Sequence, residues 1–383
     1  MKPFKHKNLK EIVKNFTPNW FTLNMGTGIS FLIMHNTRIN FPYENIILKS
    51  FWVMDIFFFL LFSILFLSRI IFFPETVKLM LKHPVQSMFL GAIPMGLVPI
   101  LEGFTVFKVN LPDVHYLNVS LFLWWFDAFL AVTIGLGVVF LMFTIQKEHS
   151  LKNMTAVWLL PIVACEVTAS AGGFLAPYFN IHTAKVLIFS SYVLWSFSVP
   201  LAFSVLVILF LRLVTHKLPD IAMATTSWLT LGPLGTGALS LLLLGHASDI
   251  KLHENFGEFL NHFGIITGIL IWGYALWWWI MSWLITLKYF KEGLPFSMGW
   301  WAFTFPVGVF TASTYAIYNL TGYEIFKILG YIFTVQLLTF WFIVFFKTLP
   351  GIWSGYLFNA PCLSEESGLP KNMEECKKFK EKD

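Results

Sequence analysis

Ten long stretches of apolar residues follow one another along the chain, separated by short polar segments. Apolar runs of about 20 residues or more are typical of helices that cross a membrane, because a helix of that length spans the hydrocarbon layer. We therefore predict ten membrane-spanning helices. They cover residues 17–37, 46–72, 84–103, 115–145, 155–178, 183–213, 222–246, 259–288, 296–319 and 324–347.

The basic residues between these spans are unevenly distributed. Alternate segments, beginning with the N-terminal one, contain 20 of the 26 Lys and Arg residues, and the intervening segments contain six. Cytoplasmic segments of membrane proteins carry the excess of Lys and Arg. We therefore expect a multi-pass protein of the cell membrane with both termini in the cytoplasm. Its expected parts are a cytoplasmic arm (1–15), a transmembrane domain (16–348) and a cytoplasmic tail (349–383).

Proline and glycine distinguish the odd-numbered spans from the even-numbered ones. The odd spans contain 13 glycines and the even spans six, and away from the span ends the even spans contain only Pro200. The even spans instead contain bulky runs such as residues 56–67 and 277–284. Every odd span contains proline, at Pro18, Pro94, Pro99, Pro161, Pro177, Pro233 or Pro306.

This asymmetry predicts which helices lie inside the protein. Proline frees backbone groups from their hydrogen bonds, and in a membrane those groups must be satisfied by protein or by water. The odd helices should therefore form an inner ring, and the even helices an outer layer facing lipid. Because every odd–even pair starts on the same side, the expected fold is an all-α integral membrane protein of five parallel hairpin repeats around a central pore. The alternative is that the small residues only permit tight helix packing.

The composition excludes several classes of protein. Apolar residues make up 57% of the chain and charged residues 12%, which is far from the balance of a soluble domain. The net charge of +5 comes from loops and tails, and it favours contact with anionic lipid over nucleic acid. The three cysteines indicate neither a disulfide framework nor a metal site. We therefore expect the lipid bilayer as a partner, and no nucleic acid, metal or cofactor.

Several segments resemble a single protein family. They are FTPNWFTLNMGTGI (16–29), PVQSMFLGAIPMGLVPILEG (84–103), WLLPIVACEVTASAGGFLAP (158–177), FSMGWWAFTFPVGVF (296–310) and PGIWSGYLFNAPCL (350–363). Together they resemble the tellurite-resistance/dicarboxylate transporter family, which includes the slow anion channels of plants, fungal malate permeases and fungal sulfite pumps. The first, fourth and fifth strings look most like the malate-permease and sulfite-pump branch.

The resemblance implies a fold and a function. Members have ten helices whose five odd members line a central pore, and they assemble as homotrimers. The implied function is transport of small organic anions, above all C4-dicarboxylates such as malate, alone or with protons. The alternative is an anion channel or efflux permease for sulfite, chloride or nitrate. An enzyme would need a nucleophile–base pair or a metal cluster within the spans, which offer neither, so we do not expect an enzyme. A non-transporting scaffold gives no reason for proline in every odd helix.

Phe305 is the predicted pore gate. It precedes Pro306 near the middle of an odd span, so its ring can project toward the axis. A phenyl ring in a narrow apolar pore blocks passage by occlusion and dewetting, and a change of rotamer opens it. In the resembling channels, the phenylalanine of the string matching WWAFTFP (300–306) is the gate. The alternative is a packing aromatic, and Phe303, which points to a different face, is the second candidate for the gate.

Glu166 is the acidic residue nearest the middle of an odd span. Carboxylates within membrane spans are costly and commonly functional. We hypothesise that Glu166 binds a proton and couples it to anion movement, or that it tunes the field in the pore. The alternative is a structural acid bonded to a neighbour or to carbonyls that Pro161 frees. Asp55 and Asp127, in even spans, are expected to be structural, and Asp127 is a candidate to bond polar groups of a neighbouring inner helix.

Polar uncharged groups are the predicted ligands of a passing anion, because no Lys or Arg lies in the middle of a span. Hydroxyl and amide groups, and the N-terminal ends of helices that restart after kinks, would stabilise the anion instead. Histidines are expected at helix ends or in a solvated loop rather than at a metal site. The pore-lining candidates are Asn24, Thr27, Thr168, Thr304 and Thr311, and the predicted kinks lie at Pro94, Pro99, Pro161, Pro233 and Pro306.

Overall fold

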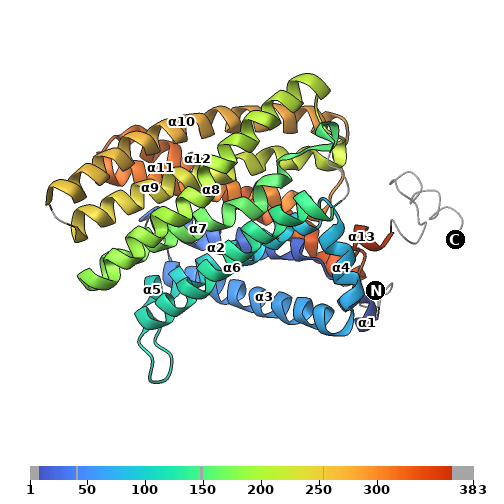
Figure 1. The fold of residues 1–383 in the computed structure, drawn as a ribbon, viewed down its shortest axis with the longest axis horizontal. Coiled ribbons are helices and arrows are strands. Elements are labelled where there is room, and N and C mark those ends of the chain that lie inside the picture. The colour runs from blue at the N-terminus through green and yellow to red at the C-terminus, as the bar shows by residue number, and fades with distance from the viewer. Residues whose placement is uncertain (1–7, 40–41, 147–149, 253, 365–383) are drawn as a thin grey trace, which may run out of the picture.

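The computed structural model describes residues 8–39, 42–146, 150–252 and 254–364, so residues 1–7 of the predicted arm and 365–383 of the predicted tail lie outside the described residues. Long helices lie side by side along the longest axis of the molecule (Figure 1). The short helices α1 (Leu9–Asn15), α4 (Pro74–Lys82) and α13 (Pro361–Ser364) lie at one end of the bundle, which we call the terminal end. The opposite end is the distal end.

Eight helical segments of the described residues are long and apolar enough to cross a membrane. They are Glu44–Phe72, Ser87–Phe107, Tyr116–Thr144, Ala156–Tyr178, Ile181–His216, Ile221–Lys251, Asn255–Lys291 and Glu324–Ser354. The prediction of a helical, multi-pass membrane protein is confirmed to this extent. The other two predicted spans contain α2 (Phe21–Asn36) and α11 (Phe305–Thr321), whose α-helical parts have 16 and 17 residues.

Five helices form the centre of the bundle: α2, α5 (Ala92–Phe107), α7 (Leu160–Leu175), α9 (Leu231–Lys251) and α11. Contacts join α2 to α5, α5 to α7, α7 to α9, α9 to α11, and α11 back to α2, so these helices close into a cycle. Glycine permits close approach within it. A Cβ atom added to Gly235 of α9 would lie 2.7 Å from the backbone nitrogen of Phe310 in α11, so only glycine fits at that crossing.

Five longer helices surround this cycle: α3 (Glu44–Phe72), α6 (Tyr116–Thr144), α8 (Ile181–His216), α10 (Glu254–Lys291) and α12 (Glu324–Ser354). In their apolar stretches 22–39% of the residues are buried, whereas the segments that contain α5, α7 and α9 bury 72–94%. Large apolar side chains on the outer helices are therefore exposed, as expected for surfaces that contact lipid tails.

Each inner helix is preceded by a short 3₁₀ helix. These are η1 (Pro18–Trp20), η2 (Ser87–Gly91), η4 (Ala156–Leu159), η6 (Ile221–Thr230) and η7 (Met298–Phe303). The next α-helix then begins, and in four of the five it does so with a proline among its first three residues, at Pro94, Pro161, Pro233 and Pro306. Proline fits there because the first turn of an α-helix does not use its backbone N–H groups.

The prolines at the predicted kinks take two kinds of position. Pro94, Pro161, Pro233 and Pro306 stand where a 3₁₀ helix changes to an α-helix. Pro99 lies inside α5, where it removes one backbone hydrogen bond of a continuing helix.

Tryptophan side chains join each outer helix to the inner helix of the next hairpin. In every case the indole N–H donates to a backbone carbonyl or a hydroxyl group of that inner helix. The bonds run from Trp52 to Ile100 O (3.1 Å), Trp124 to Thr168 O (2.9 Å), Trp195 to Gly237 O (3.0 Å), Trp272 to Thr314 Oγ1 (2.8 Å) and Trp341 to Thr27 Oγ1 (3.1 Å). The fifth bond leads from the last outer helix back to the first inner helix and so completes the cycle.

Arg69, near the end of α3, connects three segments at the terminal end. Its buried guanidinium donates to Phe16 O over 2.5 Å, to Thr76 Oγ1 over 3.0 Å and to Thr76 O over 2.9 Å. Its remaining contact is with Cys362 Sγ, 3.8 Å away. A planar guanidinium with five donors suits such a site, because it can bond several fixed acceptors at once.

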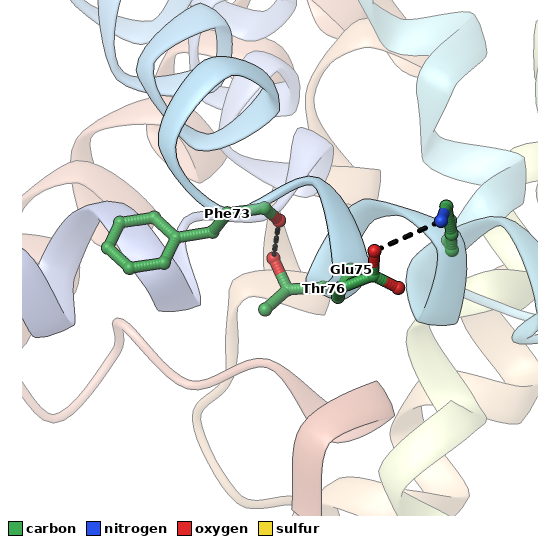
Figure 2. A network of polar contacts seen from close by, with 4 residues as sticks. Phe73, Glu75 and Thr76 are labelled. Carbon is green, nitrogen blue, oxygen red and sulfur yellow. Dashed lines mark hydrogen bonds and ion pairs between the residues drawn. The ribbon is translucent and has the colours of Figure 1, made fainter.

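The turn between α3 and α4 presents Thr76 to Arg69. The Thr76 hydroxyl donates to Phe73 O over 2.7 Å, and the neighbouring Glu75 pairs with Lys78 over 3.0 Å (Figure 2). The first of these bonds fixes the threonine side chain at the start of α4, so its oxygen is already oriented when it accepts from Arg69.

Candidate functional site

Two cavities lie between the five inner helices. The smaller one, of about 50 Å³, is lined by the 3₁₀ helices and the first turns of the inner helices, and we call it the terminal cavity. The larger one, of about 370 Å³, is lined by later turns of the same helices and is the distal cavity. The residues that line the two cavities belong to the inner helices and the segments next to them, and none belongs to an outer helix.

Among the described residues, Phe305 is the one that lines both cavities. Its side chain is 4% exposed. It is the first residue of α11, directly after Thr304, where the 3₁₀ winding of η7 ends. The Thr304 hydroxyl donates to Trp301 O over 2.7 Å and holds this junction. The change of helix type therefore places the phenyl ring between the two cavities.

Phe303, the second candidate for the gate, has different surroundings. Its ring packs edge-on against Trp228, with centroids 5.7 Å apart, and in a tilted arrangement against Phe340 of α12, with centroids 5.2 Å apart. It lines neither cavity. Its contacts are those of a side chain that holds an outer helix against the inner ring.

Glu166 is fully buried on α7 and lines neither cavity. Its carboxyl group faces the other way, toward Gly237 of α9 and the hydroxyl of Ser198 on α8. Neither carboxyl oxygen makes a hydrogen bond with a described residue, although the backbone carbonyl of Glu166 accepts one from Ser240 over 2.9 Å.

Three of the polar candidates contact outer helices. The Asn24 amide bonds the side chain and, over 3.2 Å, the backbone carbonyl of Asp55 on α3. The Thr168 hydroxyl donates to Asp127 Oδ2 on α6 over 2.6 Å, which confirms the bonding role predicted for Asp127. Thr27 accepts the indole N–H of Trp341.

Thr311 bonds within its own helix, and Thr304 bonds back to the preceding η7. Thr311 donates to Val307 O over 2.7 Å, as Thr304 does to Trp301 O. Such bonds to a preceding carbonyl are the usual way in which a helix satisfies a buried hydroxyl. None of the five polar candidates lines either cavity.

The distal cavity contains charged and titratable side chains that sequence reasoning did not select. His35 lies at the end of α2 and Arg38 just beyond it, Glu102 lies on α5, and His246 lies on α9. Glu102 was missed because the predicted span ended at 103, whereas α5 continues to Phe107. The signal was present: Val98, Glu102 and Val106 recur at helical spacing and line one cavity.

No group of three or more His, Cys, Asp or Glu side chains that could hold a metal ion occurs among the described residues. The arrangement is instead two small chambers that meet at one phenyl ring, with mainly apolar walls and a few polar groups at the distal end. In this arrangement a single aromatic side chain separates the two cavities.

Known proteins resemble this chain over most of its length. Residues 15–349 match the family described as voltage-dependent anion channel. A sulfite efflux pump of Arthroderma benhamiae is 36% identical over 344 residues, which cover 88% of this chain and 91% of that protein. An uncharacterised transporter of Methanocaldococcus jannaschii is 30% identical over 354 residues, with coverage of 91% and 98%. A malic acid transport protein of Schizosaccharomyces pombe is 26% identical over 355 residues, with coverage of 89% and 79%.

Proposed function

Because the chain belongs to the voltage-dependent anion channel family, we propose that it moves small anions across a membrane through the ring of inner helices. Membership confirms the resemblance drawn from the sequence strings, and the relatives are named as transport proteins rather than enzymes. One observation carries the proposal: two cavities approach each other from opposite ends of the ring and meet at Phe305.

The proposed architecture is ten transmembrane helices in five parallel hairpin repeats. The closed cycle of inner helices supports it, and so do the indole bonds that recur from one hairpin to the next. The distribution of Lys and Arg supports a cytoplasmic location for the terminal end. An anion leaving the cell would then pass from the terminal cavity to the distal cavity.

Phe305 is the proposed gate of this path. The Phe305 ring lies between the two cavities. A passing ion would therefore have to lose hydration water beside an apolar group, which costs free energy. Rotation of the Phe305 side chain about its torsion would join the two cavities without moving a helix, because the cavities on both sides leave room for the ring. The occluded arrangement described here is the closed state in this proposal.

Two substrates are proposed, and similarity supports each. Malate, the substrate first predicted from the sequence, is supported by the relative named for malic acid. Sulfite, the alternative, is supported by the relative at 36% identity. The two differ in size and charge distribution, so direct comparison of their fluxes decides between them.

Reconstitution in liposomes tests the function. We expect saturable uptake of sulfite, malate or both, measured with and without a proton gradient. The matched control is Ala312→Trp, because Ala312 lines the distal cavity and a larger side chain would fill it. Uptake that is no faster than in empty liposomes for sulfite, malate and chloride alike would refute the proposal.

We also propose that three copies assemble, each with its own pathway, as the family resemblance implies. The exposed apolar faces of the outer helices support contact with lipid or with another copy equally well. Cross-linking in native membranes should give a trimer, and a monomer at every cross-linker concentration would refute this proposal.

A further inference from the structure

Among the described residues that line the two cavities, Glu102 is the one with an acidic side chain. It lies on α5, its side chain is 9% exposed, and it makes no hydrogen bond or ion pair with another described residue. An unpaired carboxylate at this depth is costly, so such groups are usually retained for function. Its position in an anion pathway is unexpected, because a negative charge there opposes the solute.

We propose that Glu102 is a proton-binding residue of the pathway, and that an anion passes Phe305 only while Glu102 carries a proton. This inference rests on the function proposed above. It assigns to Glu102 the proton-binding role that sequence reasoning gave to Glu166.

The chemistry of the carboxyl group supports this role. In its charged form Glu102 repels an anion that shares the distal cavity. Binding a proton from water in the cavity removes that charge and creates an O–H group, which can donate a hydrogen bond to the anion. One proton and one negative charge are then together in the cavity, so a monoanion and the proton form a neutral pair.

The positions of the two buried glutamates favour Glu102. Glu102 lines the distal cavity, whose volume of about 370 Å³ leaves room for water and a small solute. Glu166 is completely buried and faces α8 and α9, away from both cavities. A proton could therefore exchange at Glu102 in the arrangement seen here, whereas exchange at Glu166 would need the helices to separate.

Other titratable groups lie near enough to contribute to a pH response. His35 of α2, Arg38 just after α2, His246 of α9 and Tyr315 of α11 line the same cavity. From the elements packed beside α5, Asp55 and Lys49 of α3, Tyr116 of α6 and Tyr178 of η5 (Ala176–Tyr178) face this region. The two histidines are the main rivals, because histidine side chains commonly serve as proton-binding groups in pH-sensitive proteins.

The test compares full-length variants in liposomes that have the same pH on both sides, so that orientation in the membrane does not matter. Flux of sulfite and of malate is measured from acidic to neutral pH. The ratio of variant to wild-type flux is taken at each pH, because titration of the substrate cancels in that ratio. Glu102→Gln replaces the carboxyl group by a neutral group of the same shape.

We expect Glu102→Gln to transport at every pH, so that its ratio to wild type rises with pH, by at most about tenfold per pH unit for one titrating group. Glu102→Asp should keep the pH response with a shifted midpoint. Glu166→Gln, His35→Gln and His246→Gln are the matched controls, and their ratios should stay constant with pH.

The failures of the two proposals are distinguishable. Absence of flux in the wild type at every pH refutes the proposed function and this inference together. Wild-type flux with a constant ratio for Glu102→Gln refutes this inference alone, as does loss of flux in folded Glu102→Gln. A pH-dependent ratio for Glu166→Gln or for a histidine variant, with a constant one for Glu102→Gln, assigns the proton to that residue instead.

Discussion

The indole N–H of Trp341, on the last long helix, donates a hydrogen bond of 3.1 Å to the hydroxyl of Thr27, on the first inner helix, 314 residues earlier in the chain. The four equivalent tryptophans join hairpins that follow one another in sequence. This bond alone among the five joins the two ends of the sequence, so it holds the last hairpin against the first.

Trp341→Phe should destabilise the protein by about 1 kcal/mol, since a buried intramolecular hydrogen bond contributes about that much. Thr27→Val removes the acceptor of the same bond, so the double variant should lose less than the sum of the single variants. Thermal unfolding in detergent measures the effect. Trp353→Phe is the control, because Trp353 is half-exposed on the same helix. Strict additivity would show that the two side chains are not coupled.

Phe305→Ala should increase anion flux, because removing the ring joins the terminal and distal cavities. Proteoliposome flux per folded protein is the measurement. Phe303→Ala is the matched control, since Phe303 lies two residues away and packs against Trp228 and Phe340. It should lower stability by about 3 kcal/mol without raising flux. An increase in flux for Phe303→Ala and none for Phe305→Ala would move the gate to Phe303.

Thr168→Val should destabilise the protein by about 1–3 kcal/mol, because it leaves a buried carboxyl oxygen of Asp127 without its donor. Thr311→Val is the matched control: Thr311 is equally buried, but its hydroxyl bonds a carbonyl of its own helix. Its effect should be smaller. Flux per folded protein should stay unchanged in both variants. A changed substrate preference in either variant would indicate that its threonine contacts the transported anion.

Arg69→Lys should loosen the C-terminal segment around Cys362, because lysine retains the charge but lacks the planar fork. Losing one or two hydrogen bonds of about 1 kcal/mol each would raise local opening about tenfold. The rate of maleimide labelling of Cys362 measures this opening, in a Cys376→Ser background so that one tail thiol is removed. Cys165, buried in α7, is the internal control and should stay unreactive. Equal labelling rates of Cys362 with and without the substitution would show that Arg69 does not hold the C-terminal segment in place.

Much of the fold follows from the order of apolar and proline residues. Proline in every odd span predicted inner helices, and α5, α7 and α9 are indeed far more buried than the outer helices. The 3₁₀ helices were not predicted, because proline restricts the helix after it and does not specify the winding before it. The indole bonds did leave a signal: Trp52, Trp124, Trp195, Trp272 and Trp341 are spaced by 72, 71, 77 and 69 residues.

Less of the site could be predicted. Sequence gives the depth of a residue in a span but not the direction of its side chain once every face of the helix is buried. Thr168 and Asn24 lie at plausible depths, yet they bond Asp127 and Asp55 of outer helices. Glu102 was overlooked because it lies one residue before the end of its predicted span, 84–103, whereas α5 continues to Phe107. Phe305 could be predicted because it precedes Pro306. The change from 3₁₀ to α-helix at this proline, rather than hydrophobicity, determines where its side chain lies.

The bond between Trp341 and Thr27 joins the last hairpin to the first in the same way as the other indole bonds join hairpins that are consecutive in sequence. Arg69 also brings the backbone at Phe16 and the side chain at Cys362 together at one end of the bundle. The connectivity therefore has no required starting hairpin. A circular permutant, with the present ends joined by a flexible linker and new ends opened between α6 and α7, would place the same side chains against one another in a rotated order.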